Sequence, residues 1–112
     1  MRRVDGSLFS WKTVGSVTGT SNAITFPATA RELYIDISWN NLLNYRYTLY
    51  LQMESLNSNA NMYISFGGYH DSTSENGGWI RVTKSTRQIW LAGLTYKGND
   101  VSSTGVMRVQ YR

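Results

Sequence analysis

The chain has 112 residues, of which 41% are hydrophobic, and this suits one globular domain with a single core and excludes a disordered chain. Only 16% of the residues are charged, the net charge is +4, and the basic residues never form a run of three, which argues against the basic stripe of a nucleic-acid-binding protein. The absence of cysteine excludes disulfides and thiolate metal sites, and no apolar run approaches the ~18 residues of a membrane-spanning helix.

Apolar and polar residues alternate with a period of two through most of the chain. Because side chains alternate across a β-strand, this pattern favours half-buried strands over helices. The alternation predicts about eight strands, at residues 11–17, 23–26, 32–39, 45–53, 62–69, 79–84, 88–96 and from 105 onward.

The first three strands carry local signals of their own. Gly15 predicts a bulge or a close backbone approach within the first strand. The second strand ends at Pro27, the only proline, which cannot donate a hydrogen bond to a strand ladder. The apolar face of the third strand is expected to consist of Leu33, Ile35, Ile37 and Trp39.

The later strands continue the pattern, with turns between them. Residues 70–78 are almost all polar and form the longest expected loop, and residues 97–100 form a strong turn signal. The residues expected to face the core from these strands are Tyr45, Tyr47, Leu49, Leu51, Met53, Met62, Ile64, Phe66, Ile80, Val82, Met107, Val109 and Tyr111.

Regular strands separated by turn clusters favour an antiparallel sandwich or barrel. We predict an all-β fold, an antiparallel two-sheet sandwich of jelly-roll type that spans residues 11–112, with residues 1–10 as a lead-in or linker. An immunoglobulin-like sandwich is the alternative, because the sequence does not separate the two topologies.

Titratable residues that could support catalysis are few. The chain has one histidine, His70, and seven acidic residues, and it lacks the glycine pattern that surrounds a nucleophilic serine in hydrolases. His70, Asp71 and Glu75 lie on one loop, but their spacing is not that of a calcium-binding loop. We therefore expect no enzymatic activity, no metal site and no cofactor.

Several aromatic residues fall on the polar side of the alternation, among them Tyr34, Tyr50 and Tyr63. Exposed rings can stack on sugars, form a subunit interface or pack within a thin sandwich, and the sequence leaves all three open. If these rings form an interface between copies of the chain, the expected interface residues are Tyr34, Arg46, Tyr50 and Tyr63.

A series of short motifs resembles a C-terminal module of phage and prophage tail proteins from Gram-positive and gut bacteria. The order and spacing of the motifs carry this resemblance, and it covers residues 11–112. The matching segments are Trp11 to Thr20, Ile24-Thr25-Phe26-Pro27, Glu32-Leu33-Tyr34-Ile35, Gly67-Gly68-Tyr69, Tyr96 to Val101 and Tyr111-Arg112.

The resemblance implies a tail-fibre, baseplate or receptor-binding tip domain, which is usually a β-sandwich and often trimeric, and it brings no catalytic residues. We therefore expect a non-catalytic domain, in a virion or outside the cell, that recognises a bacterial surface polysaccharide and does not insert into membranes or bind nucleic acid. The expected saccharide site is a loop edge formed by Trp39, Asn40, Tyr69, His70, Asp71, Glu75, Asn76 and Trp79. The alternatives are a trimerisation domain of a tail protein and a carbohydrate-binding module attached to a bacterial hydrolase.

Overall fold

A computed structural model describes residues 10–39, 42–56, 61–68 and 76–112. In this part of the chain the strands are β1 (Lys12–Thr18), β2 (Ile24–Thr25), β3 (Glu32–Trp39), β4 (Leu42–Gln52), β5 (Asn61–Gly68), β6 (Asn76–Thr83), β7 (Gln88–Tyr96), β8 (Asn99–Asp100) and β9 (Gly105–Tyr111). Two short 3-10 helices are present as well, η2 (Met53–Ser55) and η3 (Ser102–Thr104).

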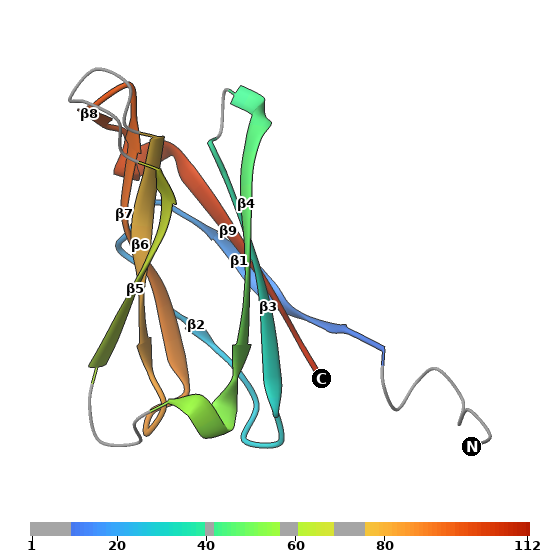
Figure 1. Ribbon diagram of the computed structural model, residues 1–112. Coiled ribbons are helices and arrows are strands. Elements are labelled where there is room, and N and C mark those ends of the chain that lie inside the picture. The colour runs from blue at the N-terminus through green and yellow to red at the C-terminus, as the bar shows by residue number, and fades with distance from the viewer. Residues whose placement is uncertain (1–9, 40–41, 57–60, 69–75) are drawn as a thin grey trace.

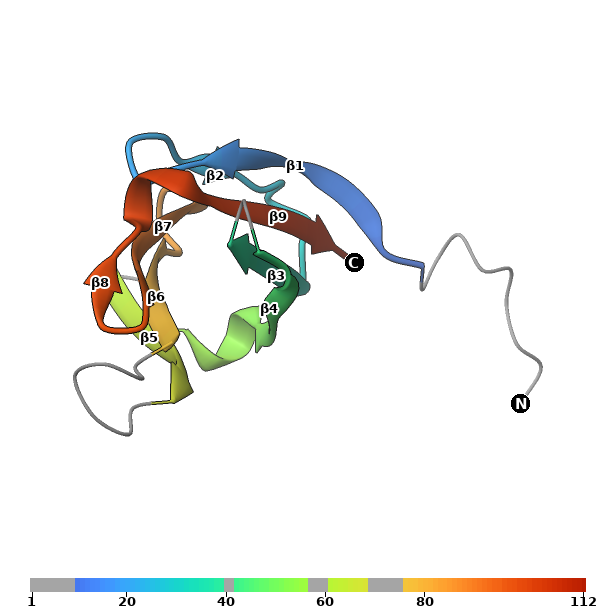
Figure 2. The same ribbon diagram turned by 90° about the horizontal axis from the view of Figure 1, so that it is seen from above.

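The strands form two antiparallel sheets that face each other (Figures 1 and 2). The first sheet has the order β1-β9-β3-β4, and the second has the order β2-β7-β6-β5, with β8 paired to β7. The predicted two-sheet, all-β sandwich is therefore confirmed.

The edge strands β1 and β2 come from the start of the chain and pair with strands from its later part. β1 pairs with the last strand, β9, and β2 pairs with β7, so the two ends of the chain wrap together as in a jelly roll. The middle of the chain forms hairpins within a sheet, because β3 pairs with β4 and β5 with β6. This order differs from the two sheets of an immunoglobulin domain, which was the alternative.

The core lies between the sheets and follows the predicted alternation. Leu33, Ile35 and Ile37 of β3 are fully buried, as are Met107 and Val109 of β9. They face the buried side chains of the second sheet, which are Phe66, Ile80, Val82, Ile89, Leu91 and Leu94. The apolar faces of the central strands thus pack against the opposite sheet, which accounts for the period of two in the sequence.

Gly105 allows the two sheets to approach closely at the start of β9. A Cβ atom at this position would lie 2.6 Å from Leu94 and 2.8 Å from Leu91 of the second sheet. The expected bulge at Gly15 is present as well, as a shift in the pairing of β1 with β9 between Thr13 and Gly15.

The predicted loop at residues 70–78 is too long, because β6 begins at Asn76. Gly77 and Gly78 are strand residues that pair with Gly67 and Phe66 of β5. A Cβ atom at Gly77 would lie 2.4 Å from the carbonyl oxygen of Phe66, so a residue with a side chain does not fit at this pairing. The glycines that resemble loop residues in the sequence are needed for close strand pairing.

The boundaries of β4 also differ from the prediction, since the strand begins at Leu42 and gives way to η2 at Met53. The turn predicted at residues 97–100 is tight, because Lys97 and Gly98 both have positive φ and β8 follows at Asn99. Two consecutive residues with positive φ are typical of the tightest hairpin turns.

Candidate functional site

The outer face of the second sheet carries a row of large side chains across three strands. Tyr63 of β5 is paired with Arg81 of β6, and Arg81 is paired with Trp90 of β7. Because residues in register on neighbouring strands share a face, their side chains lie next to one another. Trp79 belongs to the same face, two residues before Arg81 along β6.

The rings of Tyr63 and Trp79 are accessible to solvent, whereas the apolar side chains beside them in the sequence are partly or fully buried. Tyr63 is 60% exposed and Trp79 is 41% exposed, whereas Ile80 is completely buried on the inner face. Large exposed rings on a rigid sheet can bind a ligand without first losing much conformational freedom.

Arg81 lies at the centre of the row and is held by stacking. Its guanidinium carbon lies 3.9 Å from the centre of the Trp90 ring, which is a cation–π contact. The Nε atom of Arg81 is buried and has no hydrogen-bond partner among the described residues. The plane of the guanidinium is therefore held by the stacking contact, and its unsatisfied Nε donor is buried.

Gly93 allows Trp79 to lie close to the backbone of β7. The two residues are paired, and a Cβ atom at position 93 would lie 2.5 Å from the Trp79 ring. Glycine at this position therefore leaves the room that the indole occupies. The pairing of β6 with β7 also shifts between Trp79 and Ile80, which is a β-bulge or similar irregularity of the kind often found near binding sites.

These residues line an open groove of about 520 Å³ on the outside of the sandwich. We call it the outer groove, and its lining residues are Thr20, Ser21, Tyr63, Trp79, Arg81, Trp90, Leu91 and Ala92. Thr20 and Ser21 come from the connection between β1 and β2 and add hydroxyl groups to the lining. The lining contains aromatic rings, hydroxyls and one positive charge, and none of these residues is acidic.

The outer face of the first sheet carries a different aromatic cluster. The Trp11 ring centre lies 5.4 Å from that of Tyr34 and 6.1 Å from that of Tyr50. Arg112 stacks on Trp11 at 4.2 Å, and its Nε atom donates a hydrogen bond of 2.6 Å to Glu32. The aromatic rings and the charged groups of this cluster thus contact one another within the chain.

The ion pair in this cluster changes the acidity of Glu32. The hydrogen bond from Arg112 is the largest influence and holds the pKa of the Glu32 carboxyl below its ordinary value, and a hydrogen bond from Tyr50 acts in the same direction. Glu32 is therefore ionised at neutral pH and unsuited to act as a general acid.

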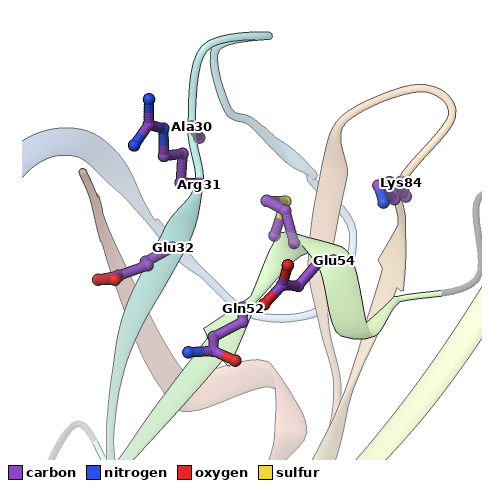
Figure 3. A pocket seen from close by; sticks show the side chains of 7 residues that line it. Ala30, Arg31, Glu32, Gln52, Glu54 and Lys84 are labelled. Atoms are coloured by element: carbon purple, nitrogen blue, oxygen red, sulfur yellow. The ribbon is translucent and has the colours of Figure 1, made fainter.

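A second depression, of about 390 Å³, opens at the end of the sandwich where η2 and the β6–β7 turn lie (Figure 3). Its side chains come from the start of β3, the junction of β4 with η2, and Lys84 just after β6. Its lining includes both acidic and basic side chains, and the lining residues are Ala30, Arg31, Glu32, Gln52, Met53, Glu54 and Lys84. This mixture of charges and the lack of exposed rings make it a weaker candidate for a binding site than the outer groove.

The predicted saccharide site requires a correction at Trp39. This residue is 1% exposed, and its Nε1–H group donates a hydrogen bond of 2.8 Å to the carbonyl oxygen of Thr95 in the other sheet. Trp39 packs in the core against Tyr47 and Phe66. It therefore joins the two sheets and offers no ring to a ligand.

The remaining residues of that predicted site do not form one loop edge in the described structure. Trp79 is exposed, on the outer face of the second sheet, while Asn76 lies in β6 opposite Gly68 and not in a loop. The other predicted site residues lie outside the described part of the chain, and these are Asn40, Tyr69, His70, Asp71 and Glu75.

The predicted interface residues lie on two different surfaces. Tyr34, Arg46 and Tyr50 come from β3 and β4 and share the outer face of the first sheet, where Arg46 pairs with Asp36 at 3.3 Å. Tyr63 lies on the outer face of the second sheet. The alternation predicted correctly that these side chains point outward, but it carries no information on which sheet each strand joins.

Comparisons with protein-family models, curated proteins and solved structures find no match to this chain. Within the described ranges, no three histidine or acidic side chains are arranged to hold a metal ion. In the same part of the chain, no helix has the length and apolar character needed to cross a membrane.

Proposed function

We propose that this chain is a non-catalytic saccharide-binding domain and that the outer groove is its binding surface. The observation that carries the proposal is the set of rings on one face of β5, β6 and β7, where Tyr63, Trp79 and Trp90 surround Arg81. The apolar faces of sugar rings can pack on such aromatic rings, and the hydroxyls of the sugar can bond to nearby polar groups.

The size and lining of the outer groove support this proposal. Its volume of about 520 Å³ lies in the range of roughly 300–1,000 Å³ that is common for ligand sites. Thr20 and Ser21 supply hydroxyls that can donate or accept hydrogen bonds, and Arg81 supplies donors. A site of this kind can bind a sugar, and no catalytic step is assigned to it.

We further propose that the domain belongs to a phage tail protein and recognises a polysaccharide on the bacterial surface. The order of the sequence motifs from Trp11 to Arg112 supports this assignment. The gene neighbourhood distinguishes it from a binding module attached to a hydrolase. Tail and holin genes nearby would support the tail protein, whereas a catalytic domain encoded upstream in the same reading frame would favour the hydrolase.

A glycan array with host cell-wall and capsular polysaccharides tests the binding function. Tyr63→Ala should reduce binding by about tenfold, because it removes an exposed ring from the outer groove at a cost of about 1.4 kcal/mol of binding free energy. Tyr50→Ala is the matched control, because Tyr50 is also exposed but lies on the other sheet. The proposal fails if no glycan binds, or if Tyr50→Ala reduces binding while Tyr63→Ala does not.

A second candidate function is assembly of tail-protein chains through the outer face of the first sheet. The cluster of Trp11, Tyr34 and Tyr50 favours it, because Tyr50 remains 47% exposed at its edge and such residues are enriched in subunit interfaces. Sedimentation equilibrium at high concentration should then show a trimer that Tyr50→Glu dissociates. A wild-type chain that remains monomeric would exclude this candidate.

A further inference from the structure

The geometry of Arg81 points to an acidic saccharide as the ligand of the outer groove, with the guanidinium binding a carboxylate or phosphate carried on the sugar. This inference deepens the proposed function and rests on it. A neutral sugar would satisfy the rings of the groove, whereas only an anion would also satisfy the charge at its centre.

The charge of Arg81 is not neutralised by a carboxylate of the described structure. The two ion pairs found there join Arg46 to Asp36 and Arg112 to Glu32, both on the other sheet. None of the residues that line the outer groove is acidic. The positive charge in the groove is thus available to a ligand.

The orientation of Arg81 is fixed before a ligand binds. Stacking on Trp90 at 3.9 Å holds the plane of the guanidinium, and pairing with Tyr63 and Trp90 places it between two rings. An arginine donates hydrogen bonds in a rigid fork that matches a carboxylate or phosphate, so a fixed guanidinium loses little conformational freedom on binding. Because the Nε atom is buried, a ligand oxygen would bind the terminal nitrogens of the guanidinium.

The rings and the charge together define the ligand class. Trp79 and Tyr63 flank Arg81 along and across the strands, so a sugar stacked on either ring would place its substituents near the guanidinium. Uronic acids carry a carboxylate on the sugar ring, and sugar phosphates carry a phosphate. The shared chemistry is an oxyanion attached to a carbohydrate.

Titration calorimetry with two acidic probes separates these sources. The first probe is a galacturonic acid trimer, and its methyl-esterified form is the neutral comparison with the same rings. The second probe is a phosphorylated maltotriose, and maltotriose itself is the neutral comparison. At least one acidic probe should bind 10- to 100-fold more tightly than its neutral comparison, a difference of about 1.4–2.8 kcal/mol in binding free energy.

Variants then assign the preference to Arg81. Arg81→Gln should remove the difference between acidic and neutral probes, and Arg81→Lys should keep part of it because the charge remains. Arg46→Gln is the matched control, since this arginine lies on the outer face of the other sheet and should leave binding unchanged. Unfolding curves of each variant show whether the fold is intact.

The outcomes distinguish the two levels of the proposal. Three results overturn the acidic ligand alone. The array glycans bind with no preference for acidic ones, neither acidic trimer binds at millimolar concentration, or Arg81→Gln leaves the preference unchanged. The absence of binding to every glycan on the array overturns the saccharide-binding function and the acidic ligand with it. A preference that Arg81→Gln removes and Arg46→Gln keeps supports both.

Discussion

The close pairing of β6 with β7 makes Gly78 a sensitive position for stability. A Cβ atom at residue 78 would lie 2.1 Å from the carbonyl oxygen of Gly93, about 1.3 Å short of the 3.4 Å at which ordinary contact begins. The obstructing atom belongs to the backbone, so no side chain can rotate to make room. Gly78→Ala therefore forces the two strands apart at this point.

The cost of this separation follows from the contacts it disrupts. Overpacking costs typically about 1–3 kcal/mol, and weakening one or two ladder hydrogen bonds around the Gly78–Leu94 pair adds about 0.5–1.5 kcal/mol each. We expect Gly78→Ala to lower the free energy of unfolding by about 2–4 kcal/mol. For a domain of this size the melting temperature should fall by at least about 8 °C.

Urea denaturation followed by circular dichroism measures this effect, and Gly15→Ala is the matched control. Gly15 also lies in a strand, but no heavy atom lies within 4 Å of the Cβ position there. Its substitution should change the free energy of unfolding by less than about 1 kcal/mol. The reasoning is refuted if Gly78→Ala unfolds within about 0.5 kcal/mol of the wild type, or if the two alanine variants are equally destabilised.

Three further substitutions test the ion pair, the core and the outer groove. The hydrogen bond from Arg112 lowers the pKa of Glu32 below its ordinary value of 4.5, so the ionised carboxylate stabilises the fold at neutral pH. This stabilisation disappears as the pH falls through the lowered pKa. Glu32→Gln should thus destabilise the domain more at pH 7 than at pH 3 in urea titrations, and an equal effect at both pH values would contradict this. Trp39→Phe removes the hydrogen bond to Thr95 and part of the buried volume, so the free energy of unfolding should fall by about 1–3 kcal/mol. A fall of less than about 0.5 kcal/mol would contradict this role of Trp39. Gly93→Ala should displace the Trp79 ring and weaken glycan binding about tenfold, with less loss of stability than Gly78→Ala. Unchanged binding would show that the Trp79 ring is not part of the site.

The sequence allowed the layers of the fold to be predicted because strand alternation is a local property. Leu33, Ile35 and Ile37 are buried as expected, and Tyr50 and Tyr63 are exposed as expected. The alternation shows which side of a strand meets the core, and in a sandwich this holds whichever strand is the neighbour.

The composition of the outer groove could not be predicted, because it depends on strand pairing. Tyr63, Arg81 and Trp90 are separated in sequence and become neighbours only through the register of β5, β6 and β7. For the same reason, the alternation does not separate Tyr63 from Tyr34, which lies on the other sheet.

The start of β6 and the place of Trp39 were missed for different reasons. Gly77 follows a polar segment and resembles part of a loop, although in the fold it allows two strands to pair closely. Trp39 ends β3 beside an expected loop, which made it an attractive site residue, but it belongs to the apolar face of the strand and is buried. Here the periodicity was the better guide than the proximity to a loop.

Saccharide binding on the outer face of the second sheet is tested most directly by the indole N–H signals of the four tryptophans in nuclear magnetic resonance spectra. Trp79 and Trp90 line the outer groove, Trp39 is buried in the core, and Trp11 lies on the outer face of the first sheet. Titration with a glycan selected from the array should shift the signals of Trp79 and Trp90 in a saturable way and leave the other two unchanged. A shift confined to Trp11, or saturable binding that moves neither Trp79 nor Trp90, would contradict the assignment of the site.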